Sequence, residues 1–157
     1  MKYYGDLGFG MFGWADTDIG IFGGQRSGGF QKRGQYRCSF SIYDTAVKVE
    51  TGADKIVGKL ELIVTEPEND SDPYEIMELV NLEIAREHRE QGYGRRAVEA
   101  VMRAAPDAVR VCDIKKTKLK FWTKLGLEDL TNKGGKLSGH IRKEHAPQQA
   151  RSMTMSM

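Results

Sequence analysis

Two glycines, Gly92 and Gly94, stand in an arginine-rich segment where a phosphate-binding loop would be expected. The segment, residues 89–94, lies between an apolar run typical of a strand and an amphipathic run typical of a helix. Glycine lets the backbone approach an anion closely. A helix that begins there leaves its first N–H groups unpaired at the positive end of its dipole. We therefore predict a binding site for the diphosphate of a nucleotide-like cofactor.

The same glycines also satisfy G-x-G-x-x-A over residues 92–97, a pattern of dinucleotide-binding folds. Asp113 would then end the next strand, about 20 residues later, where such folds place the acid that binds the ribose. However, residues 86–91 separate the strand from the first glycine, whereas that glycine follows the strand almost directly in a dinucleotide fold. No further strand–helix repeats follow Asp113 to complete a doubly wound sheet. We therefore favour a different cofactor.

The elements around the glycines predict a strand–helix–strand unit. Residues 76–85 form an apolar strand, and the helix over 93–105 has an apolar face and stops at Pro106. Residues 108–114 form the next strand, which we expect to run parallel to the first. Upstream of this unit, residues 36–43 and 55–65 are predicted strands. Downstream of it, residues 116–125 are predicted to form a short helix, and residues 127–131 and 136–143 a hairpin. The fold class is therefore α/β.

Two segments of the chain, one in this unit and one after it, resemble the GCN5-related N-acetyltransferases (GNAT). Residues 78–97, with R-x-x-G-x-G at 89–94, resemble the coenzyme A loop of that family. Residues 121–127, Phe-Trp-Thr-Lys-Leu-Gly-Leu, resemble its later signature Phe-Tyr-x-Lys-x-Gly-Phe. The resemblance covers about residues 36–143. It implies a mixed, mostly antiparallel sheet, splayed at a central β-α-β unit that holds acetyl-CoA.

The resemblance also implies which residues bind acetyl-CoA. The backbone of Leu82 and Ile84 would pair with the pantetheine amides as one more strand would. Phe121 and Lys124 belong to the later motif. The diphosphate would be held by the loop and the first helical turn: Arg89, Glu90, Gln91, Gly92, Tyr93, Gly94, Arg95 and Arg96. A Cβ at either glycine would push the phosphates away.

Acetyl transfer to an amine requires a group that takes the amine's proton. Glu78 stands where the histone-type branch of the family has its glutamate base, and Glu83 is a second candidate. Strict alternation places Glu78 on the same face as Leu82 and Ile84, although a bulge would change this. An ion pair with a neighbouring Arg or Lys is the alternative role for Glu78.

Trp122 departs from the family pattern. Members of the family often have a tyrosine there that protonates the departing thiolate. An indole N–H donates a hydrogen bond but is not a proton acid near neutral pH. Either another group or water does this work, or the thiolate leaves without an acid, or catalysis has been lost.

The chain ends differ from the central domain. Ten of the first 34 residues are glycine, interleaved with aromatic residues and without a helical or strand period. We therefore predict a glycine-rich arm over 1–35, an acyltransferase domain over 36–145 and a disordered tail over 146–157. The arm either packs on its own domain or mediates a homodimer or larger assembly. In the second case the chain could be a catalytically degraded fold that serves for docking.

Composition narrows the remaining alternatives. The 157 residues suit one domain, and no apolar run approaches the roughly 18 residues of a membrane span, so we expect a cytoplasmic protein without a membrane partner. Residues 1–77 contain 8 Lys and Arg against 12 Asp and Glu, whereas residues 78–157 contain 16 against 10. The positively charged half contains the glycine loop, as an anionic cofactor would require. A lysine row over 115–124 gives weak support for a nucleic-acid substrate. Cys38 and Cys112 do not indicate a metal site.

Overall fold

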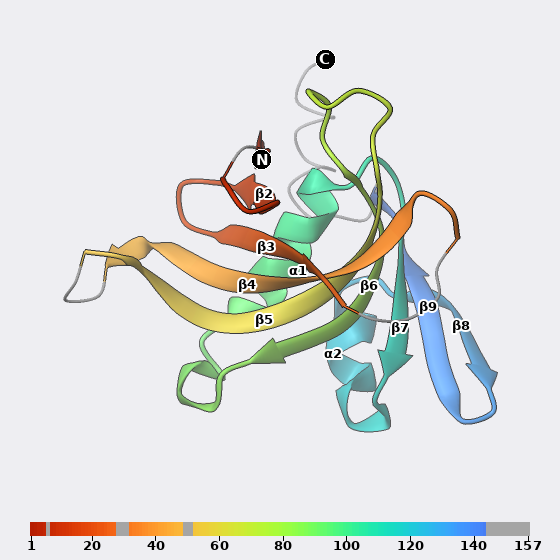
Figure 1. Cartoon of the computed structure of the whole chain (residues 1–157). Coiled ribbons are helices and arrows are strands. Elements are labelled where there is room, and N and C mark those ends of the chain that lie inside the picture. The colour runs from red at the N-terminus through yellow and green to blue at the C-terminus, as the bar shows by residue number, and fades with distance from the viewer. Residues whose placement is uncertain (6, 28–31, 49–51, 144–157) are drawn as a thin grey trace, which may run out of the picture.

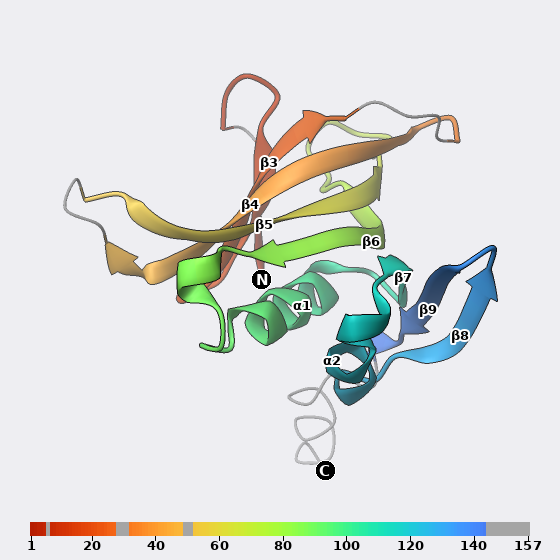
Figure 2. The same cartoon turned by 90° about the horizontal axis from the view of Figure 1, so that it is seen from below.

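The computed structural model describes residues 1–5, 7–27, 32–48 and 52–143. Their strands form one nine-stranded sheet in the order β1-β2-β3-β4-β5-β6-β7-β9-β8 (Figures 1 and 2). The elements in chain order are β1 Lys2–Tyr4, β2 Phe12–Ala15, β3 Gly20–Arg26, β4 Gln35–Lys48, β5 Asp54–Thr65, β6 Glu75–Ile84, η1 Arg86–His88, α1 Tyr93–Ala104, β7 Val109–Ile114, η2 Lys116–Lys118, α2 Leu119–Lys124, β8 Glu128–Lys133 and β9 Lys136–Ile141. No described helix has the length and apolarity to cross a membrane.

The strand–helix–strand unit β6-α1-β7 confirms the central prediction. β6 and β7 are parallel, and every other neighbouring pair in the sheet is antiparallel. The parallel ladder has only two pairs, Glu78↔Arg110 and Leu79↔Val111. Beyond them the two strands separate, so the sheet is splayed at its centre as predicted.

Helix α1 covers one face of the sheet (Figure 2). Its buried side includes Ala97, Val98 and Val101, which join Leu60 and Leu62 of β5 in one hydrophobic core. These side chains recur every three or four residues on the helix and every two on the strand, as the two periods require. The core therefore fixes α1 over the strands beside the splay.

A bulge in β6 decides which of its side chains face α1. Pairing with β5 passes from Glu61↔Asn81 to Leu62↔Leu79, so Val80 is an extra residue on β6. An extra residue shifts the alternation of faces on the two sides of the bulge.

The bulge corrects the predicted orientation of Glu78. Strict alternation placed Glu78 on the face of Leu82 and Ile84, and that prediction is wrong. Leu82 pairs with a buried leucine of β5 on the α1 side, whereas Glu78 shares the opposite face with Asn81 and Glu83. The two candidate bases therefore lie on one face, away from α1.

The N-terminal segment is not an arm. Its described residues form β1, β2 and β3, which continue the sheet from β4, so the prediction of an unstructured layer is wrong for them. Phe12, Trp14 and Ile21 are buried in the same core as α1. Of the two alternatives for this segment, packing on its own domain holds for β1, β2 and β3. The predicted tail, 146–157, lies outside the described residues.

Glycine hid these strands from the sequence pattern. A Cβ on Gly13 would meet the carbonyl oxygen of Ile21, and a Cβ on Gly23 would meet that of Ser39. Glycine therefore occupies positions where neighbouring backbones approach closely, between the aromatic residues that enter the core. Because glycine occupies these positions in place of residues that favour strands, the alternating pattern that marks a strand is interrupted.

Two phenylalanines of the N-terminal segment provide a matched test of this correction. Phe12 is 4% exposed and stacks on Tyr74 with 4.3 Å between ring centroids, whereas Phe9 is fully exposed. Phe12→Ala is expected to lower the free energy of unfolding by about 3–5 kcal/mol, because it leaves a core cavity. Urea denaturation should show no comparable loss for Phe9→Ala. Equal stability of the two variants would contradict a folded N-terminal layer.

Candidate functional site

A cavity of about 1080 Å³ lies at the splay between β6 and β7. Its wall is built by the end of β6, the loop before α1, the end of β7 and α2. Most residues predicted from the two motifs line it: Leu82, Glu83, Ile84, Arg89, Glu90, Gly92, Tyr93, Gly94, Arg95, Phe121 and Trp122. The fold thus brings together two segments that are about 30 residues apart in the chain.

Four predicted residues are not among those lining the cavity. Gln91 is exposed, and its side-chain amide donates to the backbone oxygen of Glu87 at 3.4 Å. Lys124 is exposed at the end of α2. The side chain of Arg96 donates a hydrogen bond to the turn between β2 and β3. Its backbone N–H donates to the carbonyl oxygen of Gly92 at 3.1 Å within the helix. Glu78, the fourth, contacts β7 instead.

The glycine loop has the backbone geometry of an anion site. Gly92 precedes α1 with φ +83°, in the left-handed region, and a Cβ there would have no heavy atom within 4 Å. The next three N–H groups, those of residues 93–95, lie in the first turn of α1, before intrahelical acceptors are available. They are oriented as donors for an anion at the positive end of the helix.

Gly94 is constrained by packing. A Cβ on Gly94 would lie 3.3 Å from the ring of Phe121, so a larger side chain must displace that ring or enter the cavity. Phe121 in turn packs edge-on against Trp122, with 5.1 Å between ring centroids. Glycine at this position therefore lets α1 and α2 approach each other beside the cavity.

Two arginines of the loop have partners within the protein. Arg89 donates through Nε to the carbonyl oxygen of Ile84 at 2.9 Å, which ties the loop to the end of β6. That carbonyl was predicted to pair with pantetheine. Arg95 lines the cavity and pairs with Glu99, one helical turn later, at 3.1 Å. The side chain of Arg95 is 62% exposed, and such exposed pairs are weak, so its guanidinium remains available to an anion.

Trp122 is a wall of the cavity and part of the core. It is 6% exposed, and its carbonyl oxygen accepts the N–H of Leu127 at 3.1 Å as α2 ends. Gly126 has φ +95°, which explains the glycine in this motif. The motif over residues 121–127 thus forms the C-terminal end of α2 and holds two aromatic rings, those of Phe121 and Trp122, in place.

A polar network lies at the cavity on the face away from α1. Glu61 of β5 accepts hydrogen bonds from Arg37 of β4 at 2.8 Å and from Asn81 of β6 at 2.6 Å. The Arg37 guanidinium lowers the pKa of Glu61 by hydrogen bonding, against burial, which raises it, and the Asn81 amide lowers it further. Glu61 and Asn81 line the cavity. Sequence reasoning missed this network because it depends on the register of three strands.

Glu78 is held by β7. Its Oε1 accepts from Arg110 at 3.3 Å and from the Cys112 thiol at 2.9 Å. Burial and the bond to Glu78 raise the pKa of Cys112 to about 12, so the thiol is neutral at physiological pH. Cys112 lines the cavity, whereas Glu78, to which it is bonded, does not. The ion-pair alternative for Glu78 is thus present in the structure.

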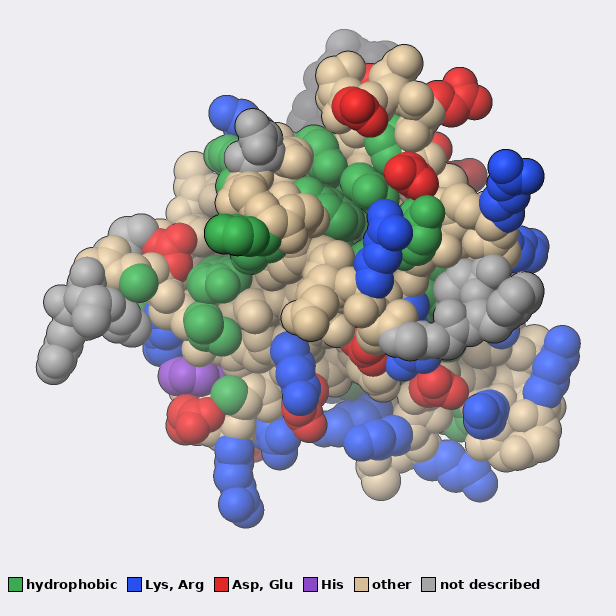
Figure 3. All heavy atoms as spheres, in the orientation of Figure 1, with side chains coloured by type: hydrophobic (Ala, Val, Ile, Leu, Met, Phe, Trp, Pro, Cys, Tyr) green, Lys and Arg blue, Asp and Glu red, His purple; other side chains and the backbone are tan. Residues whose placement is uncertain are grey.

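Positive charge gathers near the cavity. Lys and Arg side chains line the lower edge of the molecule in Figure 3, the edge where α2 lies in Figure 1. Among the wall residues outside the two motifs are His88 of η1 and, from the end of β7 into η2, Asp113, Lys115, Thr117 and Lys118. The sequence singled out Asp113 only for a dinucleotide site and Lys115 and Lys118 only as part of the lysine row. Among the described residues, no group of three or more His, Cys, Asp or Glu could hold a metal ion.

The Glu78–Cys112 bond can be tested by thiol alkylation. Glu78→Gln removes the negative charge that stabilises the protonated thiol, so the alkylation rate of Cys112 at pH 8 is expected to rise about tenfold for each pKa unit lost. Peptide mass spectrometry separates Cys112 from Cys38. Glu83→Gln is the control, since no contact joins Glu83 to the thiol among the described residues. The same rate in all three proteins would refute the bond.

Comparisons with known proteins agree with this geometry. Residues 26–127 match the model of the acetyltransferase (GNAT) family. No curated protein matches the chain in sequence. A tyrosine-to-phenylalanine mutant of the AtaT toxin, solved with the C-terminus of the antitoxin AtaR and acetyl-CoA, superposes with TM-score 0.50 at 15% identity, covering 71% of each chain. The KacTA–DNA complex contains a chain with TM-score 0.51 at 15% identity, covering 78% of this chain and 76% of that one. At such identity these two structures share the fold with this chain.

Proposed function

Because the chain belongs to the acetyltransferase (GNAT) family, we propose that it moves the acetyl group of acetyl-CoA directly to an amine acceptor. Acetyl-CoA is the cosubstrate of this family, as the resemblance of the two motif segments implied. The observation that carries the proposal is the cavity at the splay, because both motif segments line it. Either motif alone would be weaker support.

The residues present fit the cosubstrate. The space next to Gly92 is open within 4 Å of an added Cβ, and the first-turn amides 93–95 follow directly. These amides and the Arg95 guanidinium would hold the diphosphate. Leu82 and Ile84 would flank the pantetheine arm, with Phe121 and Trp122 as the apolar wall. When bound, acetyl-CoA supplies an acyl group activated as a thioester.

The acceptor would approach from the face away from α1. Glu61, Asn81 and Glu83 line the cavity from that face of the sheet. Glu61 keeps its negative charge because Arg37 lowers its pKa, which suits the attraction of a cationic amine. The same low pKa makes Glu61 a poor proton acceptor.

Glu83 is the candidate base that the geometry favours. It lines the cavity, and its pairing with Lys59 at 3.5 Å joins two exposed side chains and is therefore weak. Its carboxylate would take the proton that the amine loses as nitrogen bonds to the acyl carbon. Glu78, the first candidate from the sequence, becomes the second; it does not line the cavity and would act through the thiol of Cys112, which contacts Glu78 and lines the cavity.

The thiolate would leave without a protein acid at position 122. Trp122 carries no acidic proton near neutral pH, and Cys112 with a pKa of about 12 is too weak an acid to protonate an ordinary thiolate. A thiolate is a good leaving group, so a proton from water afterwards is sufficient. Retained catalysis is therefore compatible with tryptophan in the motif.

The assembly predicted through residues 1–35 would use the connection between β1 and β2. Leu7, Phe9 and Met11 are exposed there, and Phe9 has a positive φ of 55°. Exposed apolar side chains close together favour a partner surface. The antitoxin and the DNA in the two similar structures are partners of those proteins and do not identify a partner for this chain.

Gly94→Val tests the cosubstrate site. The added methyl groups must collide with Phe121 or enter the cavity, so acetyl-CoA affinity is expected to fall about tenfold to a hundredfold, the range of one or two lost charge-assisted hydrogen bonds. Isothermal titration calorimetry measures this, with circular dichroism to verify the fold. Gly94→Ala should give an intermediate loss. Wild-type affinity in a folded Gly94→Val protein would rule out this site.

Paired carboxylate substitutions identify the base. Glu83→Gln is expected to lower kcat about a hundredfold or more, and to remove the rise of kcat with pH, if Glu83 takes the proton. Glu78→Gln is the competing variant, and Glu68→Gln, in an exposed loop outside the cavity, is the control. A large loss in Glu78→Gln alone would transfer the role to Glu78.

A further inference from the structure

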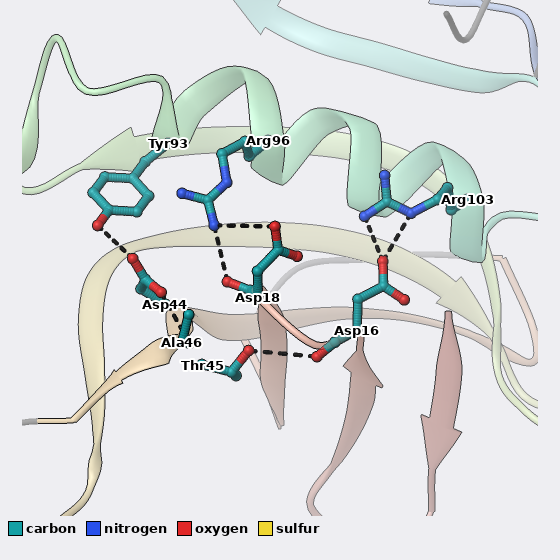
Figure 4. A network of polar contacts seen from close by, with 8 residues as sticks. All are labelled: Asp16, Asp18, Asp44, Thr45, Ala46, Tyr93, Arg96 and Arg103. Carbon is teal, nitrogen blue, oxygen red and sulfur yellow. Dashed lines mark hydrogen bonds and ion pairs between the residues drawn. The ribbon is translucent and has the colours of Figure 1, made fainter. Parts of the chain in front are cut away.

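Ion pairs and hydrogen bonds tie α1 to the N-terminal strands (Figure 4). Asp16 and Asp18 lie in the turn between β2 and β3, and both face arginines of α1. Arg96 donates to the backbone oxygen of Asp18 at 2.9 Å and lies 3.6 Å from its carboxylate. Arg103, at the other end of α1, pairs with the Asp16 carboxylate at 2.6 Å. The turn therefore contacts α1 at both ends.

A third contact is buried. The hydroxyl of Tyr93 donates to Oδ2 of Asp44 on β4 at 2.6 Å, and the Ala46 amide donates to the other carboxylate oxygen at 3.0 Å. Tyr93 is 6% exposed and Asp44 5%. Burial raises the pKa of Asp44, but these two hydrogen bonds, together with the positive charges of Arg96 and Lys55, leave the pKa lowered, so the buried carboxylate is charged. A charged hydrogen bond shielded from water is a strong one.

The Tyr93 ring also receives Arg96. The guanidinium lies 5.1 Å from the ring centroid, close enough for a cation–π contact. Tyr93, Asp44, Arg96 and Asp18 are thus one connected set, which we call the α1 clamp. Asp18 precedes residue 26, where the family match begins, so part of the clamp comes from strands outside the matched region.

The α1 clamp holds the first turn of α1, whose backbone amides are the proposed donors to the diphosphate. Tyr93 stands between Gly92 and Gly94 and is the first residue of α1. Its backbone faces the proposed anion site while its hydroxyl reaches β4. Hydrogen-bond donors act on an anion only when their supporting groups hold them in place.

We propose that Tyr93 and Arg96 are positioning residues that hold the first turn of α1 in the geometry that binds the diphosphate of acetyl-CoA. They act through the backbone amides of residues 93–95. Arg96 therefore contributes to cosubstrate binding without touching the cosubstrate. The inference rests on the proposed function of the cavity. It adds that contacts from the N-terminal part of the sheet set the affinity of the cavity for acetyl-CoA.

Arg103 provides a matched control. It pairs with the same turn from the same helix, but it follows Arg96 by seven residues, about 10 Å along the helix axis. Arg103→Met should lower the melting temperature without changing cosubstrate affinity. Arg96→Met and Tyr93→Phe should change both.

The test compares two ligands by calorimetry. Acetyl-CoA carries the diphosphate, whereas S-acetylpantetheine lacks it. Tyr93→Phe and Arg96→Met are expected to bind acetyl-CoA about tenfold more weakly and to keep the wild-type affinity for S-acetylpantetheine. In kinetics the loss should appear in the KM for acetyl-CoA and not in kcat.

Three outcomes would overturn the inference. Unchanged acetyl-CoA affinity in both variants would show that the clamp positions nothing. Equal losses for both ligands would indicate general loosening of the domain. Failure of the unsubstituted protein to bind acetyl-CoA would refute the proposed function itself, and is recognised before any variant is measured.

Hydrogen exchange provides a measurement that needs no ligand. Tyr93→Phe should speed exchange of the amides at residues 96 and 97, the first that have acceptors within α1, and Arg103→Met should not. Unchanged exchange in Tyr93→Phe would also overturn the inference.

Discussion

The separation of β6 from β7 is the constraint on which the molecule depends. In the described chain these parallel strands share two residue pairs and then diverge. The crossover through α1 forces them to be parallel, and the divergence leaves the end of β6 beside a cavity instead of a neighbouring strand. The loop, the start of α1 and the end of β7 all meet there because each begins or ends at the splay.

Charge is distributed to suit that opening. On the face away from α1, the acidic residues of β5 and β6 pair with Arg37, Lys59 and Arg110 on neighbouring strands. On the other face, α1 is held by acids of β4 and of the β2–β3 turn. The helix whose positive end faces the proposed anion site is therefore fixed by the N-terminal part of the sheet, and the face away from α1 is kept polar by cross-strand pairs.

Much of the fold follows from local sequence. Alternation predicted β4, and runs rich in apolar residues predicted β5 and β6. The apolar helical face and Pro106 bounded α1, and Gly92 and Gly94 marked the loop. The N-terminal strands were missed because their glycines serve backbone packing, which no local period reveals. The orientation of Glu78 was missed because one extra residue, Val80, changes the face and can be recognised only from the pairing with β5.

The sequence by itself determined the GNAT family, the acetyl-CoA cosubstrate and the two segments that meet at the cavity. Those features depend on residue type and on spacing within short stretches. Only the tertiary structure decided that Glu61 lines the cavity with Asn81, that Arg96 turns to Asp18, and that Glu78 contacts Cys112 and does not line the cavity itself. Each of these contacts joins residues between 20 and 78 positions apart, so strand register and helix packing set them, and both are properties of the whole folded chain.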